Sequence, residues 1–462
     1  MLRPFRGVRF TIDDLAAVTS PPYDLIDEAG VRRLLDAHPN NVVRLILPGA
    51  DRHRYAEARE TLRRWLSDGM LSADGTPAVY VYEQSGPGVL QRGLIGDVGL
   101  AAPELGIILP HEDVMPGPVA DRLALMRTTE ANLEPIFLLY DGADGTATRL
   151  VDEVASSRPP LAEATTRDGL RHRLWAIVDV GELDAIATDL RPRQALIADG
   201  HHRYATYLAL QREHHAGAGG RDGAGSRAGD RDGDGAGGAA RVEDGSEAGG
   251  AAKAGDGSAQ SARRTPSEPG PWDFGLALLV DSRSYPPDLK AIHRVIPDLS
   301  LDEALDRAKD SWRVHEHADL TAGLTALEGT DGPAYLLSAG GRTYLLTDPD
   351  PVRLEQAMPS GRSAGWRALN TSVLAEFLLP KVWGMADDER MVRIVHHDPE
   401  AAVRLARQTD GIAVLLRPLA VDDVLAVAAQ GERVPRKSTS FGPKPLTGMV
   451  LRVLTWEHDI RP

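Results

Sequence analysis

The residues best suited to chemistry lie in one short stretch near the middle of the chain. An apolar run with strand character, residues 195–198, breaks at Asp199-Gly200, and a helix-forming segment follows from residue 203. The first N–H groups of a helix lack partners and carry the positive end of its dipole, which makes such a turn an anion site. Gly200 has no Cβ, so the backbone can approach a ligand closely. The stretch therefore predicts a phosphate-binding turn.

The polar side chains of this turn suit the same ligand. Arg203 offers a planar fork of donors for phosphate, and the two histidines are donors or proton carriers near neutral pH. The aspartate is a base, a metal ligand or a helix cap. We assign catalysis to Asp199, His201 and His202, and ligand binding to Gly200, Arg203 and Tyr204.

Two other interpretations of the turn remain open. It has the composition of an ordinary strand-to-helix junction with a capping aspartate and exposed histidines. A zinc site is disfavoured, because the chain has no cysteine and His201 and His202 are adjacent rather than four residues apart.

A histidine beside two carboxylates follows another apolar run. Residues 107–110 deliver His111-Glu112-Asp113 to the end of a predicted strand, a place suited to acid–base or metal chemistry. A surface turn has the same composition. We place His111 and Glu112 among the catalytic candidates.

The loop 435–445 is basic, rich in hydroxyl groups and stiffened by prolines within an acidic protein. It is a second anion clamp or a solvated loop, and its candidate ligand-binding residues are Lys437, Ser438, Thr439 and Lys444.

Three further motifs carry less specific signals. His293 and Arg294, at a predicted strand end, are a second candidate phosphate contact, or a buried histidine with its neighbour. The run 396–398, His-His-Asp, could ligate a metal, but a strand-to-helix cap suits it better. Pro21-Pro22 hold the following Tyr-Asp on a rigid loop that either lines a pocket or makes a crossover.

Hydrophobic periodicity predicts a mixed α+β fold with strands and helices interleaved along the chain. We expect a strand at 41–48 and a helix at 121–133. Residues 274–280 and 291–296 are expected to be strands of one sheet. A Gly-Gly turn predicts a hairpin over 334–347.

One segment interrupts this pattern. Residues 216–271 are mainly Gly, Ala, Asp, Arg, Ser and Glu with almost no apolar bulk, which predicts a disordered insertion. The expected organisation is an N-terminal α/β part at 1–215, this insertion, and a C-terminal α+β part at 272–462.

Composition narrows the class of protein. The chain has 462 residues, 42% of them hydrophobic, and a formal net charge of -15, which disfavours nucleic acid as a partner. It has no cysteine and no apolar stretch long enough to span a membrane. These features predict a cytoplasmic protein, and they leave the oligomeric state open.

The run 199–205, Asp-Gly-His-His-Arg-Tyr-Ala, resembles the phosphate-binding box of the ParB/sulfiredoxin superfamily. The resemblance implies a mixed-sheet core of that kind, with nucleotide phosphate held at the box. His201 stands where sulfiredoxins have cysteine, so their thiol chemistry is not implied.

A second resemblance extends along most of the chain. The order and spacing of several short motifs are similar to those of the family called domain of unknown function 1015. The motifs start at Pro4, Pro21, His111, Asp121, Asn132, Pro135, His172, Asp199, His293 and Lys437.

Together these observations predict an enzyme that binds a nucleotide or a small phosphorylated metabolite and performs phosphoryl transfer or hydrolysis. ATP or another nucleotide and Mg²⁺ are the expected cofactors. The resemblance to ParB-like free-serine kinases implies a serine- or phosphoserine-like substrate. The alternatives are a non-enzymatic, nucleotide-responsive binding module like ParB clamps, and a structural protein that binds only adventitious anions.

Overall fold

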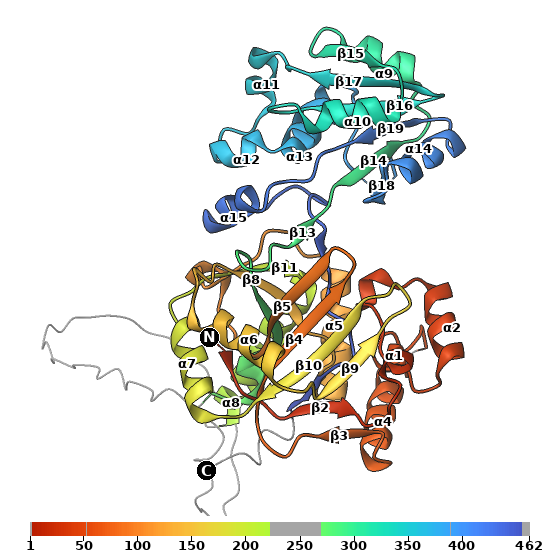
Figure 1. Cartoon of the computed structure of the whole chain (residues 1–462). Helices are drawn as coiled ribbons and strands as arrows, with labels where there is room; N and C mark the ends of the chain where they lie inside the picture. The colour runs from red at the N-terminus through yellow and green to blue at the C-terminus, as the bar shows by residue number, and fades with distance from the viewer. Residues whose placement is uncertain (1, 52, 222–268, 389, 455–462) are drawn as a thin grey trace, which may run out of the picture.

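The chain folds into two lobes, which Figure 1 shows one above the other. The computed structural model describes residues 2–51, 53–221, 269–388 and 390–454. The first lobe is built on a nine-stranded sheet and a smaller four-stranded sheet, and the second on a six-stranded sheet. This architecture confirms the predicted mixed α+β class.

The nine-stranded sheet has the order β6-β11-β8-β12-β5-β4-β10-β9, with β1 paired to β5. The pairs β6–β11 and β8–β12 are parallel, and the other pairs are antiparallel. The strands are β1 (Leu2–Arg3), β4 (Val79–Gly86), β5 (Val89–Gly99), β6 (Ile108–Leu109), β8 (Ile136–Tyr140), β9 (Ala162–Thr165), β10 (Arg171–Ile177), β11 (Ala195–Asp199) and β12 (Phe274–Asp281).

Both faces of this sheet are covered. Alternate residues of β4 enter different apolar clusters: Val79 and Val81 face helices α6, α7 and α8, whereas Tyr80 and Tyr82 face the N-terminal helices and the four-stranded sheet. The helices are α1 (Leu15–Val18), η1 (Tyr23–Leu25), α2 (Glu28–Ala37), α3 (Val43–Ile46), α4 (Arg54–Ser67), η2 (Pro103–Leu105), α5 (Pro116–Thr129), α6 (Thr146–Ser157), α7 (Val180–Leu190), α8 (His201–Arg221) and η3 (Pro271–Asp273).

The last described strand returns to the first lobe. In the four-stranded sheet, β21 (Leu451–Val453) lies between β2 (Gly7–Phe10) and β7 (Ala131–Asn132), and β3 (Leu71–Ala73) pairs with β2. Arg452 is fully buried there, with its Nε 2.6 Å from Asp97 Oδ1. Strand β21 is therefore part of the first lobe's core, although the second lobe precedes it in the sequence.

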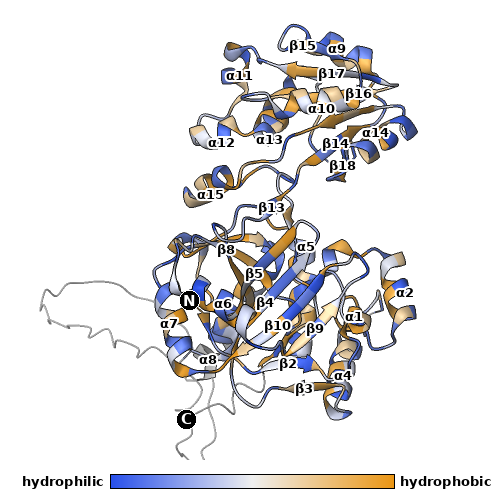
Figure 2. Ribbon diagram, in the orientation of Figure 1, coloured by the Kyte–Doolittle hydropathy of each residue, from blue (hydrophilic) through white to orange (hydrophobic). Residues whose placement is uncertain are grey.

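The second lobe has an antiparallel sheet of order β15-β17-β16-β19-β14-β18. Its helices carry both colours in Figure 2, as expected for helices with one buried face. The elements are α9 (Leu301–Ala308), α10 (Leu320–Glu328), α11 (Pro351–Ala357), α12 (Ala364–Ala368), α13 (Asn370–Val373), η4 (Leu374–Val382), α14 (Pro399–Gln408), α15 (Val421–Ala429), β14 (Ile292–Ile296), β15 (Arg313–His317), β16 (Tyr335–Ala339), β17 (Arg342–Thr347), β18 (Arg393–His396) and β19 (Ile412–Leu415).

Two segments join the lobes. The outgoing segment carries β13 (Asp288–Leu289), which pairs antiparallel with β20 (Phe441–Gly442) of the returning segment. We call the returning segment, residues 433–447, the strap, because it runs from the second lobe across the first.

Three sequence predictions are corrected. The predicted strand at 41–48 is wrong, since residues 43–46 form helix α3. The Asn41 side chain, just before this helix, accepts the otherwise unpaired Val43 N–H at 2.9 Å, which favours the helical turn. Helix α5 ends at Thr129 rather than 133, since β7 follows at once. Strands β12 and β14 lie in different sheets, because the chain passes to the second lobe between them.

The predicted insertion, 216–271, lies for the most part outside the described residues. Helix α8 continues to Arg221, and η3 begins at Pro271. The predicted boundary at 272 does not follow the sheets, because β12 and β21 belong to the first lobe. No helix in the described part of the chain is long and apolar enough to cross a membrane.

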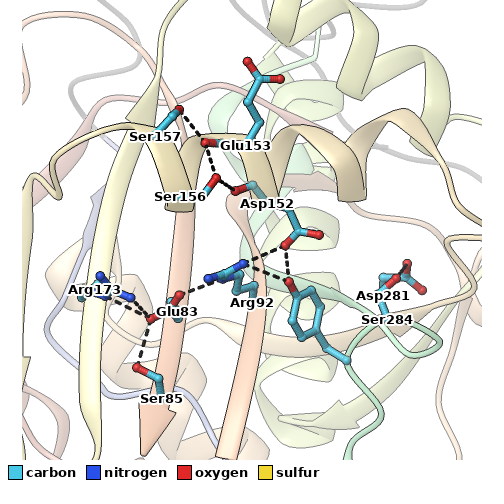
Figure 3. Close-up of polar contacts among 11 residues, drawn as sticks. Glu83, Ser85, Arg92, Asp152, Glu153, Ser156, Ser157, Arg173, Asp281 and Ser284 are labelled. Atoms are coloured by element: carbon cyan, nitrogen blue, oxygen red, sulfur yellow. Dashed lines mark hydrogen bonds and ion pairs between the residues drawn. The ribbon is translucent and has the colours of Figure 1, made fainter.

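A buried ion network ties the outgoing segment to the large sheet (Figure 3). Glu83 is fully buried and accepts hydrogen bonds from Arg92 Nε at 2.7 Å and from Arg173. Arg92 also reaches Asp152 of α6 at 3.0 Å, and the Tyr285 hydroxyl donates to the same carboxylate. Burial raises the pKa of Glu83, but the two arginines outweigh it and hold that pKa below its usual value.

We predict that Glu83→Gln lowers the free energy of unfolding by about 3 kcal/mol, because it leaves two arginines without their buried anion. Urea unfolding at neutral pH measures this change. The matched control is Glu153→Gln on the exposed side of α6, expected within about 0.5 kcal/mol of wild type.

The comparison of wild type with Glu83→Gln also gives a test that depends on pH. Because the folded pKa of Glu83 is depressed, its stabilising effect is complete above the unfolded value of about 4.3 and is lost as the pH falls. The stability gap between wild type and Glu83→Gln should therefore shrink in acid. A gap that persists unchanged at low pH would contradict the ion-pair explanation.

Candidate functional site

The candidate site forms where two parallel strands end side by side. Strands β6 and β11 pair with Ile108 opposite Ala195 and Leu109 opposite Leu196. The residues that follow each strand therefore emerge at the same edge of the sheet. This places His111 and Glu112 beside the 199–204 turn, which the sequence separates by almost ninety residues.

The turn opens helix α8 as predicted. Gly200 has a φ of 96°, and its carbonyl accepts the N–H of Tyr204 at 2.9 Å, so the helix starts at His201. Within the described residues, no acceptor takes the backbone N–H groups of His201 or His202. These N–H groups, at the positive end of the helix, therefore lack an acceptor that an anion could supply.

Arg203 is buried behind this opening. It is 4% exposed, donates from one terminal nitrogen to the Pro135 carbonyl at 2.5 Å, and pairs through the other with Asp199. Burial lowers the pKa of Arg203, but Asp199 and Glu134 outweigh it and raise that pKa. The guanidinium thus braces the turn against β8, whereas the sequence predicted a direct phosphate contact.

Asp199 is shared with a second cation. Lys444 of the strap lies 2.5 Å from Asp199 Oδ1 and 2.7 Å from Asp24 Oδ2, so one ammonium bridges two carboxylates. Burial opposes the charge of Lys444, but both carboxylates raise its pKa, and Lys444 in turn holds the pKa of Asp24 below its usual value against burial. The strap and the 22–24 loop meet at this ammonium.

The two buried histidines of the site are neutral. His111 N–H donates to His201 Nε2 at 3.3 Å, which places the His201 proton on Nδ1, 3.8 Å from Glu112 Oε2. The rings meet edge to face at 4.5 Å. Burial lowers the pKa of His111 to about 3 and that of His201 well below its usual value. Neither ring supplies a positive charge at neutral pH.

Glu112 is the carboxylate best suited to accept a proton. Its side chain is 30% exposed, and its Oε1 accepts the Thr439 hydroxyl at 2.9 Å. Because that hydroxyl is the donor, His111 Nε2 donates to Thr439 Oγ1 at 2.8 Å. Burial raises the pKa of Glu112, and Asp199 adds to the rise against the opposing effects of Thr439 and Lys437. A raised pKa is typical of a general base.

The strap brings only part of its predicted clamp to the site. Lys437 is exposed. The pKa of His202 is lowered first by the burial of His202 itself and then by the charge of Lys437. Thr439 and Lys444 lie among the site carboxylates, as described above. Ser438 instead turns away, donating to the Pro435 carbonyl at 2.6 Å.

Three other predicted residues are held by the fold rather than facing the opening. Tyr204 is 2% exposed and donates to the Ala101 carbonyl. His293 and Arg294, on β14, are 3% and 1% exposed; His293 Nδ1 accepts the Leu416 N–H at 3.3 Å, and Arg294 bonds backbone carbonyls. The predicted phosphate contact at 293–294 is therefore not made by exposed side chains.

No group of three His, Cys, Asp or Glu side chains within the described ranges is arranged to hold a metal ion. Asp398 caps helix α14 by accepting the Ala401 N–H at 2.7 Å, in agreement with the preferred interpretation of 396–398. The expected Mg²⁺ stays a prediction.

Sequence reasoning missed Glu134. This glutamate is 5% exposed, and its Oε1 accepts the Tyr23 N–H at 2.9 Å and the Thr447 hydroxyl at 3.3 Å. It joins the 22–24 loop, β8 and the strap at the rear of the site. Only the neighbouring Asn-Leu-Glu-Pro run could have signalled it. Asp24 was noticed on its rigid loop but not included among the site residues.

Two cavities, of about 460 and 540 Å³, lie elsewhere. The first is lined by residues of β2, β3 and the 161–163 segment, and the second by residues of β6, β8, β11 and α15. Neither is lined by the charged residues of the candidate site.

We predict that Gly200→Ala destabilises the protein by more than the conformational cost alone. A Cβ on Gly200 would stand 3.0 Å from Arg203 Nε and 3.1 Å from Ile136 Cγ2. The positive φ by itself costs about 1–3 kcal/mol. The control is Gly88→Ala, where φ is 72° and no atom lies within 4 Å of the new Cβ. Equal losses in urea unfolding would show that Gly200 is needed for its backbone angle only.

Comparisons with known proteins found one matching protein family and several solved structures. Residues 2–228 match the family described as "Protein of unknown function (DUF1015)". No curated protein matches the sequence.

Solved structures with a related shape include a free serine kinase in complex with AMP, 14% identical, covering 79% of this chain and 92% of that chain at a TM-score of 0.34. A conserved hypothetical protein from Pyrococcus furiosus is 13% identical, with coverages of 79% and 96% and a TM-score of 0.32. SbnI with a C-terminal truncation, from Staphylococcus aureus, is 10% identical, with coverages of 80% and 90% and a TM-score of 0.34. The ParB/sulfiredoxin resemblance stays a prediction. The match over residues 2–228 agrees with the resemblance to domain of unknown function 1015 that the sequence motifs indicate.

Proposed function

We propose that this protein is a phosphotransfer enzyme that holds the phosphate of a nucleotide or small metabolite at the start of helix α8. The observation that supports it best is the convergence of the open helix start with two lysines and three carboxylates: Lys437, Lys444, Asp24, Asp199 and Glu112. Phosphoryl transfer needs mainly positioning and positive charge. Here the helix start and Lys437 would supply the positive charge, since Lys444 is already shared by Asp24 and Asp199.

The phosphate would be bound by backbone and strap together. The free N–H groups of His201 and His202 offer directed donors, and the exposed Lys437 adds a charge from the strap. Arg203 acts from behind as a positioning residue, because its terminal nitrogens are occupied by Asp199 and Pro135. The anion therefore meets donors that the fold has already oriented.

Glu112 would be the base. A hydroxyl oxygen of the acceptor attacks phosphorus, its proton passes to Glu112, and the bond from phosphorus to the leaving oxygen breaks with its electron pair on that oxygen. Thr439 orients the Glu112 carboxylate through its hydroxyl hydrogen bond. The acceptor we propose is a small hydroxyl compound such as serine, the class implied by the resemblance to ParB-like free-serine kinases. In the hydrolytic direction, water replaces that acceptor and phosphoserine is the substrate.

We predict that ADP and pyrophosphate raise the melting temperature of the wild-type protein. A ligand at one hundred times its dissociation constant adds about 2.7 kcal/mol of stability. Lys437→Met should weaken the binding about tenfold, since a hydrogen bond to a charged group contributes about 1.5 kcal/mol or more.

The control for this measurement is Lys309→Met, an exposed lysine that follows α9 in the second lobe and pairs with Asp306. It should bind both ligands like wild type. If neither ADP nor pyrophosphate shifts the melting temperature of wild type, the phosphate site itself is rejected.

We predict that Glu112→Gln abolishes turnover of Mg-ATP with serine while leaving ADP binding within a few fold of wild type. Because a base must be deprotonated, the wild-type rate should rise with pH through the raised pKa of Glu112. Asp113→Asn, an exposed neighbouring carboxylate, is the control and should retain the rate. Nucleotide binding without turnover in wild type would instead favour the nucleotide-responsive binding module.

A further inference from the structure

Arg294 is a fully buried cation without a carboxylate partner. It lies on β14 of the second lobe and is 1% exposed. No carboxylate of the described residues is within ion-pair distance, and its Nε has no acceptor among them. Burial lowers the pKa of Arg294 to about 10. Burying a charged group without a counter-ion costs free energy. The hydrogen bonds of Arg294 therefore indicate which contacts offset this cost.

Those hydrogen bonds go to the strap. One terminal nitrogen of Arg294 donates to the carbonyls of Arg436 at 3.1 Å and Lys437 at 3.0 Å. The other donates to the Ile292 carbonyl at 3.0 Å on its own strand. The guanidinium therefore links the sheet of the second lobe to the two peptide units that flank Lys437.

The backbone of Lys437 needs such support. Its φ is 54°, in the left-handed region that residues with a Cβ adopt at a cost. The following residues are anchored in turn, Ser438 to the Pro435 carbonyl and Thr439 to Glu112. The strained residue is thus clamped on both sides, and its long side chain leaves from a fixed point.

The charge of Lys437 acts on the candidate site. It lowers the pKa values of Glu112, which follows β6, and of His202, in the first turn of α8, both in the first lobe. Two residues along the strap, Thr439 contacts Glu112 directly. The backbone of Lys437, by contrast, is held by the second lobe. Lys437 is therefore the point at which the second lobe reaches the predicted phosphate.

We propose that Arg294 is a positioning residue that holds Lys437 of the strap against the anion site at the start of helix α8. The identity of the anion in this inference rests on the proposed function. The placement of Lys437 by Arg294 does not depend on it. This role of Arg294 assigns the second lobe a part in ligand binding, and it accounts for an arginine that the sequence placed among the phosphate contacts.

The test is Arg294→Met, which keeps an unbranched apolar side chain of similar length and removes the fork. The matched control is Arg417→Met, because Arg417 also donates to two carbonyls of the second lobe, those of Thr330 and Gly332. Lys437→Met serves as the reference for loss of the ammonium. Circular dichroism and melting temperature establish that each variant is folded.

The first readout is the pKa of His202, followed by NMR titration of its imidazole. The charged groups with the largest effects on His202 are Lys437, Asp24, Arg203 and Asp199. Arg294 instead contacts the strap backbone, through the carbonyls of Arg436 and Lys437. Lys437→Met should raise this pKa by removing a positive charge. Arg294→Met should raise it too, because Lys437 moves away, whereas Arg417→Met should not change it.

The second readout is the affinity for ADP and pyrophosphate. Arg294→Met and Lys437→Met should each raise the dissociation constants about tenfold, and the double variant should be no weaker than either single variant, since both act through one ammonium. Arg417→Met should bind like wild type.

The outcomes separate the two proposals. A His202 pKa that stays at the wild-type value in Arg294→Met but rises in Lys437→Met overturns the positioning role. A rise in both variants, in a protein that binds neither ADP nor pyrophosphate, supports the positioning role and rejects the proposed ligand. Additive losses in the double variant would also overturn the proposal.

Discussion

The site depends on one carboxylate that two cations share. Asp199 ends β11, and its two oxygens are occupied by Arg203 of the next helix turn and by Lys444 of the strap. Arg203 extends the connection to the start of β8, and Lys444 extends it to Asp24 near the N-terminus. Four segments far apart in the sequence are therefore ordered by one buried charge, whose desolvation is offset only while both partners stay in place.

The strap turns this local pairing into a connection between lobes. It leaves the second lobe near Arg433, which donates to the Pro110 carbonyl at 2.7 Å, and it re-enters the first lobe where Leu446 N–H donates to the Tyr82 hydroxyl at 2.9 Å. Between these two points it supplies Lys437, Thr439 and Lys444. The site is thus incomplete without the strap, a segment that follows the whole second lobe in the sequence.

Local chemistry in the sequence was enough to predict much of this arrangement. The strand, glycine and helix order at 195–210 is a property of neighbouring residues, so β11, the left-handed Gly200 and the start of α8 could be expected. The hairpin of β16 and β17 follows from its Gly-Gly turn in the same way. Basic and hydroxyl residues between prolines likewise indicated that the strap has no regular structure over most of its length.

What could not be predicted depends on contacts between distant residues. As residue types, Arg203 and Arg294 suggest phosphate ligands. In the folded chain, however, Arg203 donates to a carbonyl and a carboxylate, and Arg294 donates to carbonyls of the strap. Only folding brings these acceptors within reach. The run at 41–48 shows the same limit for secondary structure, because a four-residue helix is too short for its apolar residues to show a helical rather than a strand period. The separation of β12 from β14 was hidden because two apolar runs in sequence order carry no sign of a change of sheet.

The distribution of charge is compatible with the proposed anion site in an acidic protein. The chain has a formal net charge of -15, but at the opening the helix start, Lys437 and Lys444 oppose Asp24, Asp199 and Glu112. The buried histidines contribute no charge, because burial keeps His111 and His201 neutral. Since two of the carboxylates already share Lys444, the positive potential left for a ligand comes from backbone N–H groups and from Lys437. A free anion would then be attracted by groups that the fold has placed, and repelled elsewhere on the surface, which favours one small phosphate over an extended polyanion.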